Sequence, residues 1–82
     1  MADYSPTMVT EMDVRNFFSP PLDYDDVTKA ELLLKIEVVE KYVSSVYGVT
    51  TSSDGRIACL LLIAAKVIQA PELAKKYYTL SY

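Results

Sequence analysis

The side chains that could do chemistry in this sequence are one cysteine, a group of aspartates and several tyrosines. Cys59 is the only cysteine and the chain has no histidine, so it can assemble neither a Cys/His metal site nor an intramolecular disulfide. Cys59 lies in an apolar run with no base close in sequence, and an apolar environment raises the pKa of a thiol. We therefore expect a packed, inert thiol rather than a nucleophile.

Three aspartates, Asp23, Asp25 and Asp26, are close enough in sequence to suggest a site for a cation with oxygen ligands. The segment lacks the glycine and the distal glutamate of a calcium-binding loop. Carboxylates that precede a helix also favour its positive N-terminal end. Helix capping is the better interpretation, and neither a metal nor a cofactor is predicted.

Composition argues against an enzyme and against a nucleic-acid-binding surface. Gly48 and Gly55 are the only glycines, so a glycine-rich phosphate loop is excluded. The formal net charge is -3 and the largest basic cluster is the pair Lys75 and Lys76, which is too little to grip phosphates. General acid-base catalysis needs a closed cleft, for which a few small helices leave little room. No sequence-specific nucleic acid is predicted as a partner, and the chain is predicted not to be an enzyme.

Charge is unevenly distributed along the chain. Residues 1–26 contain six acids against Arg15 alone, whereas the remainder contains five acids against seven bases. Such a division could orient subunits head to tail, although solvated acidic caps and loops are the simpler explanation. At 82 residues the chain has room for one small core, and domains of this size commonly gain stability from partners. With disulfides and Cys/His metal sites excluded, burial against other protein chains is what remains.

The first half of the chain predicts a short helix, an acidic linker and a long helix. A helix over residues 11–18 has Thr10 as its N-cap, and the pair Pro20 and Pro21 ends it. After a linker over residues 22–26, Asp25 or Asp26 could cap the long helix, or Thr28 could form a capping box with Glu31. This helix is expected to run to Tyr47 and to end at Gly48.

The long helix has apolar side chains on more than one side. Its polar arc is narrow, so the helix has apolar surface to bury on two sides, and in so small a protein some of that surface is expected to meet another chain. One predicted face comprises Leu32, Ile36, Val39, Val43 and Val46; the residues beyond it are Ala30, Leu34, Val38 and Tyr42; the polar arc comprises Lys29, Glu37, Glu40 and Ser44.

A third helix is predicted over residues 55–70, after a short loop at 49–53, with Asp54 as its cap. It is apolar nearly all round and is expected to be the central helix, with Leu61 in the core. Its longest apolar stretch, residues 57–65, falls short of the roughly 20 residues that span a bilayer, so no membrane partner is predicted. Pro71 ends or kinks this helix and suits the first position of a last helical turn.

The sequence thus predicts a single domain over residues 1–82, an all-α bundle of three to four helices with a long central pair. Residues 1–9 should be a loose lead-in, and residues 75–82 an extended tail that stays disordered or adds a strand to a neighbour. Tyrosine-rich segments suit interfaces, because tyrosines bury area at low entropic cost. The candidate protein-interface residues are Tyr42, Tyr47, Tyr77, Tyr78, Leu80 and Tyr82.

The order of these segments resembles the head-tail connector proteins of tailed phages. Thr10 with the sequence DVRNFF at 13–18 resembles the family's opening helix. The aspartates at 25–26 lead into a helix that closes on Tyr42, Tyr47 and Gly48, as in the second helix of the family. GRIA at 55–58 followed by LLLIAA at 60–65 resembles its third helix. The resemblance covers roughly residues 8–70 and depends on order and spacing, since each motif is a general helix signature.

The resemblance implies a structural head-completion or adaptor protomer in the neck of a virion, made in the host cytoplasm. Its partners would be the portal protein and tail or neck proteins, with self-association as a ring through which DNA passes without being read. The loop at 49–53 is short for the family, and little chain follows the third helix. The resemblance therefore does not indicate which surface would face the portal and which the tail. The alternative is a small cytoplasmic adaptor or anti-factor that binds one regulatory protein through a helical groove.

Overall fold

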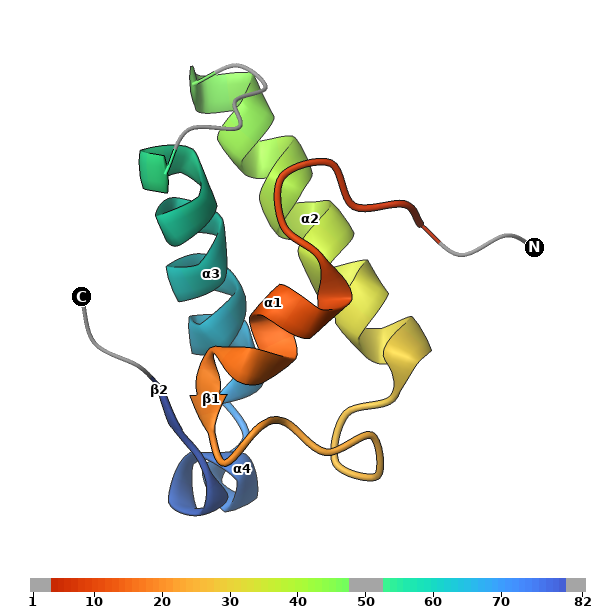
Figure 1. Ribbon diagram of the computed structural model, residues 1–82, viewed down its shortest axis with the longest axis vertical. Helices are drawn as coiled ribbons and strands as arrows, with labels where there is room; N and C mark the ends of the chain where they lie inside the picture. Colours follow the sequence, from red (N-terminus) through yellow and green to blue (C-terminus); the bar gives the residue numbers. More distant parts are fainter. Residues whose placement is uncertain (1–3, 48–52, 80–82) are drawn as a thin grey trace.

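The computed structural model describes residues 4–47 and 53–79, and within these ranges the chain is mostly helical (Figure 1). The predicted all-α bundle with a long helical pair is confirmed, and α2 and α3 form that pair. The elements are α1 (Glu11–Asn16), β1 (Phe18–Ser19), α2 (Lys29–Tyr47), α3 (Ser53–Val67), α4 (Pro71–Lys76) and β2 (Tyr78–Thr79).

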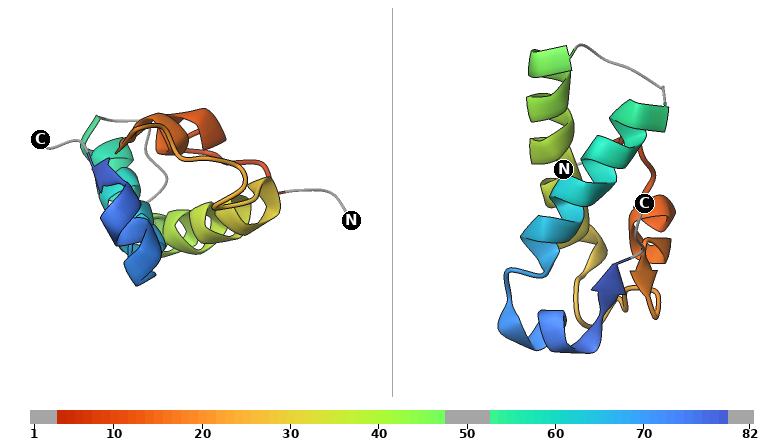
Figure 2. Two further views of the ribbon diagram at one scale, coloured as in Figure 1. Left: turned by 90° about the horizontal axis from the view of Figure 1, so that it is seen from below. Right: turned by 90° about the vertical axis from the view of Figure 1, so that its left-hand side faces the viewer.

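Helices α2 and α3 lie side by side with opposite chain directions, and α1 packs across one face of the pair (Figure 1). Helix α4 closes the end of the molecule where α3 finishes. The views from below and from the side show α1 on one side of the α2–α3 pair, while the opposite side has no other helix of the described chain over it (Figure 2). One face of the pair is therefore covered and the other is open.

The core lies between α1 and the covered face of the α2–α3 pair. The long pair contributes about half of it, and α1, the loop after it and the two chain ends supply the rest. Its buried apolar side chains are Met8, Val9, Val14, Phe17, Phe18, Leu22, Val27, Leu32, Leu33, Ile36, Val39, Val43, Cys59, Leu60, Ile63, Ala64, Val67 and Tyr77.

The helix starts follow local sequence signals. The Thr10 hydroxyl accepts a 3.0 Å hydrogen bond from the Asp13 N–H, and the Asp13 carboxylate accepts one of 3.0 Å from the Thr10 N–H. This reciprocal capping box satisfies two N–H groups at the start of α1. Among the alternatives for α2, Thr28 is the residue at the helix start, since its hydroxyl accepts from the Glu31 N–H and donates to the Glu31 carboxylate.

Two predicted boundaries of the third helix are wrong. Helix α3 begins at Ser53, so Asp54 lies within its first turn rather than at the cap, and it ends at Val67 rather than at residue 70. Pro71 is the first residue of α4, as predicted, because a proline at this position gives up no helical hydrogen bond. The predicted end of α2 at Gly48 lies outside the described residues.

Both ends of the described chain are packed rather than loose. In the expected lead-in, Met8 and Val9 are buried in the core. The extended tail expected over 75–82 is wrong at Lys75 and Lys76, which belong to α4. Strand β2 is extended as predicted, but it pairs antiparallel with β1 of the same chain, with Phe18 opposite Thr79 and Ser19 opposite Tyr78. The tail was expected either to stay disordered or to add a strand to a neighbour, whereas β2 pairs within its own domain.

Three expectations about helix faces are also wrong. Val46, predicted on the buried face of α2, is exposed, whereas Glu40, predicted in the polar arc, is only 1% exposed. Leu61, expected in the core, is 48% exposed. Helix α3 is apolar nearly all round, so its sequence pattern does not reveal which side is buried. The buried side is the one that contacts α1 and α2.

Candidate protein-binding face

The open side of α2 carries a row of exposed apolar side chains. Leu34, Val38, Tyr42 and Val46, which we call the α2 stripe, are spaced four residues apart and are between 53% and 62% exposed. Residues four apart lie on the same side of a helix. The stripe therefore continues along one side of α2, and its large apolar groups remain in contact with solvent.

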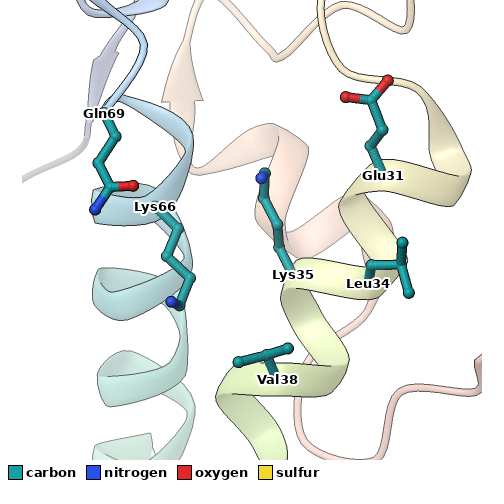
Figure 3. Close-up of a pocket in the computed structure, with 6 residues that line it drawn as sticks. All are labelled: Glu31, Leu34, Lys35, Val38, Lys66 and Gln69. Carbon is teal, nitrogen blue, oxygen red and sulfur yellow. The ribbon is translucent and has the colours of Figure 1, made fainter.

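A groove runs between the α2 stripe and α3. We define the α2–α3 groove by its lining residues, which are Val38, Val39, Tyr42, Leu62 and Lys66. It continues toward the start of α2, where Lys35 and Val38 of one helix lie across from Lys66 and Gln69 of the other (Figure 3). The groove is thus apolar around Val38 and Leu62 and becomes polar toward the start of α2, where Glu31, Lys35, Lys66 and Gln69 line it.

Glu40 lies on the opposite side of α2 and fixes the N-terminal segment against it. Its carboxylate accepts hydrogen bonds from the Tyr4 hydroxyl (2.6 Å) and from the N–H groups of Thr7 (2.9 Å), Met8 (2.6 Å) and Val9 (3.0 Å). Burial raises the pKa of this carboxyl, but the combined hydrogen bonds outweigh burial and hold its pKa below the ordinary value. Glu40 is therefore a buried anion that organises the backbone of residues 7–9.

Arg15 does the equivalent for the loop that follows α1. Its side chain is buried, donates 2.9 Å to the Glu11 carboxylate, and donates 3.1 Å and 3.0 Å to the carbonyls of Leu22 and Val27. The guanidinium also lies 3.7 Å from the centre of the Tyr24 ring, a favourable cation–π distance. Arg15 thus holds both ends of the loop over residues 22–27.

Of the candidate interface residues whose side chains the structure describes, Tyr77 is the one that lies in the core. It is 3% exposed, and its ring lies edge-on to Phe18. Its hydroxyl accepts from the Asp23 N–H at 3.1 Å and donates to the Asp26 carboxylate, which also pairs with Lys76 at 2.8 Å. Lys76 and then Tyr77 hold the pKa of Asp26 below its ordinary value. We therefore remove Tyr77 from the candidate surface.

The remaining candidates do not gather at one site. Tyr42 lines the groove, whereas Tyr78 is exposed on β2, near the C-terminal end of the described chain. Tyr47 is the last residue of α2, but its side chain is not described. The candidates Leu80 and Tyr82 lie outside the described residues. Sequence reasoning did not identify Leu62, Lys35 or Lys66 as groove residues. The groove residues on α2, Val38 and Tyr42, could have been found from the four-residue spacing of apolar residues along that helix.

The thiol and the carboxylates offer no alternative centre in the described chain. Cys59 is fully buried, and burial, followed by the nearby Glu40 charge, raises the pKa of its thiol. Within residues 4–47 and 53–79, no three His, Cys, Asp or Glu side chains are grouped so that they could hold a metal ion. A search of the same residues finds no helix with the length and apolar character needed to cross a bilayer.

Comparisons with protein-family models, with curated proteins and with solved structures found no match to this chain. The candidate face therefore rests on the geometry of the α2 stripe and the groove beside it.

Proposed function

We propose that this protein is a non-enzymatic structural subunit that binds other protein chains through the open face of α2 and α3. The observation that carries the proposal is the α2 stripe, in which four large apolar side chains remain exposed along one side of a helix. Contiguous exposed apolar surface on a small domain is typical of protein-binding sites. Tyr42 in the middle of this surface suits the role, because aromatic residues are enriched in interface cores.

The buried charges support a structural role. Arg15 and Glu40 are the two buried charged residues of the described chain. Glu40 is saturated by donors from the N-terminal segment, and Arg15 by Glu11 and two loop carbonyls. No buried side-chain nitrogen or oxygen of the described residues lacks a partner. Both groups are thus committed to holding the fold, which leaves the surface as the place where the protein acts.

The more specific proposal is that the subunit is a head-tail connector protomer in the neck of a tailed virus. The order of elements supports it, with a capped short helix, an acidic loop, a long helix and a very apolar helix. In this role the open face would meet the portal protein, a tail or neck protein, or a neighbouring copy in a ring. A helical adaptor for one regulatory protein would use the same groove.

The test is capture of the purified protein by partners from the same genome. Portal-containing heads and tail-completion proteins are each offered to the tagged chain, with a host cytoplasmic extract as the competing source. Retention by the heads or by the tail-completion protein is the expected result. If neither binds while one host regulatory protein is retained and identified, the connector proposal is wrong and the adaptor replaces it.

A further inference from the structure

The apolar part of the α2–α3 groove is lined by one charged side chain. Among the five residues that define the groove, Lys66 alone carries a charge. The large apolar side chains beside it, Val38, Tyr42 and Leu62, are between 40% and 59% exposed. Lys66 is itself exposed, and it forms no ion pair with another residue of the described chain. An unpaired ammonium group therefore lies next to apolar surface that is open to solvent.

The charge of the surface changes on the two sides of Lys66. In Figure 3 its side chain extends from α3 between the levels of Lys35 and Val38 of α2. Toward the start of α2 the surface becomes a depression of mixed charge, lined by Asp25, Asp26, Glu31, Lys35, Lys66 and Glu72. The carboxylates of this depression would repel a uniformly acidic partner. On the Val38 side no carboxylate lines the groove, so a single negative charge is favoured there.

The shape of the groove suits a third helix. Its walls are two helices, and the side chains on their open side form ridges against which another helix can pack. The polar side-chain groups of its lining are the Tyr42 hydroxyl and the Lys66 ammonium, so an extended segment would bury backbone N–H and C=O groups without partners. A helix satisfies these groups internally. The α2 stripe runs from Leu34 to Val46, a length of about 18 Å that matches about 12 residues of a docked helix.

We propose that the occupant of the α2–α3 groove is an amphipathic helix of another protein, with one carboxylate beside its apolar face that pairs with Lys66. Apolar residues spaced three and four apart on this helix would cover Val38, Tyr42 and Leu62. Covering the Lys66 ammonium without a counter-charge costs free energy, because a charge that loses its water must be paired. A carboxylate on the partner supplies the pair, and the same lysine rejects partners with a base there. The inference rests on the proposed function of the open face and adds the chemistry of its partner.

Two synthetic peptides that differ in one residue test this pairing. Each is an amphipathic helix of about 14 residues with leucines along one face, and the position flanking that face is glutamate in one peptide and lysine in the other. Amide NMR shifts of the natural chain report binding and identify the residues contacted. We expect the glutamate peptide to bind at the groove about tenfold more tightly at low salt. Lys66→Glu should reverse this preference, whereas Lys75→Glu, the same charge change on exposed α4, should preserve it, with melting temperatures that agree.

Equal binding of the two peptides, tighter binding of the lysine peptide, or no binding up to roughly 1 mM peptide overturns the proposal. Groove shifts that change with the concentration of the chain alone would assign the groove to a second copy and overturn it as well. Capture by portal-containing heads separates this inference from the proposed function. If Val38→Glu loses capture while Lys66→Glu retains it, the open face binds its partner without the ion pair, so the proposed function stands and the inference fails. If the peptide preference holds but neither heads nor tail-completion proteins are captured, the connector proposal fails and the inference stands.

Discussion

The carboxylate of Glu40, in the middle of α2, accepts a 2.6 Å hydrogen bond from the backbone N–H of Met8, which lies 32 residues earlier in the chain. Neighbouring N–H groups of Thr7 and Val9 point to the same carboxylate. Helix α2 is thus fixed to the N-terminal segment on one side and presents the α2 stripe on the other. The buried Glu40 carboxylate therefore fixes the side of α2 that is opposite the proposed binding face.

Replacement of this carboxylate should destabilise the fold. Glu40→Gln removes the negative charge and leaves an amide donor facing backbone N–H groups, so we expect a loss of about 2 to 4 kcal/mol in the free energy of unfolding. Urea denaturation followed by circular dichroism measures this loss. Glu37→Gln, which breaks an exposed pair with Lys41 on the same helix, is the matched control and should change stability by less than about 0.5 kcal/mol. Equal effects of the two substitutions would contradict the role of Glu40.

Stability should fall at alkaline pH through Tyr4. Burial and the hydrogen bond to Glu40 raise the pKa of Tyr4 from 10.0 to about 12. Because the folded-state pKa is the higher one, this contribution is complete below pH 10 and is lost as the pH rises from 10 toward about 12. Urea midpoints measured across this pH range test the effect. Tyr4→Phe should be less stable below pH 10 and should show a smaller alkaline decline; an identical decline would assign it to other groups, such as Tyr77, whose pKa is also raised.

The two faces of α3 should respond differently to truncation. Ile63 is fully buried, so Ile63→Ala should cost about 2 to 5 kcal/mol of unfolding free energy. Leu61 is largely exposed in the free chain, and Leu61→Ala should cost less than about 1 kcal/mol. The same denaturation assay compares them. A larger cost at Leu61 than at Ile63 would mean that α3 packs with the opposite face inward.

Cys59 should be unreactive until the domain opens. The thiol is fully buried and its pKa is raised, and the thiolate is the form that reacts. With a thiol reagent such as 5,5′-dithiobis(2-nitrobenzoate), we expect slow labelling of the native chain and rapid labelling in denaturant. Glu40→Gln should speed native labelling, by about tenfold for each 1.4 kcal/mol of lost stability, since opening becomes more frequent. Fast labelling of the native chain would contradict the buried position.

Local sequence signals were sufficient to predict those features that depend on residues close together in the sequence. Thr10 as the N-cap of α1 and Pro71 at the start of α4 were predicted because the interacting groups lie within one helical turn. Arg15 and Glu40 were not predicted as buried, since Arg15 also binds carbonyls of the loop at 22–27 and Glu40 binds the N-terminal segment, and helix periodicity reveals neither contact. The same limit explains Tyr77: its aromatic character fits an interface or a core equally well, and only the packing against Phe18 decides between them.

The groove was predicted only in part for a related reason. The apolar excess on α2 correctly indicated surface that its own core would not use, and Tyr42 was identified with it. Which residues of α3 complete the groove depends on which face of α3 packs against α1 and α2. In the structure Ile63 lies inside, and Leu62 and Lys66 line the groove. The apolar pattern of a helix predicts that a second apolar face exists. Which residues form that face depends on the tertiary packing.

The central claim is that the open face of α2 and α3 binds partner subunits, and one substitution tests it most directly. Val38→Glu places a charge in the middle of the α2 stripe, and Ala74→Glu places the same charge at an exposed position on α4. Both variants are compared with the natural chain in capture by portal-containing heads and tail-completion proteins, after their melting temperatures are shown to agree. We predict that Val38→Glu loses capture while Ala74→Glu retains it. Full capture of a folded Val38→Glu chain would contradict the account, because binding would then use another surface.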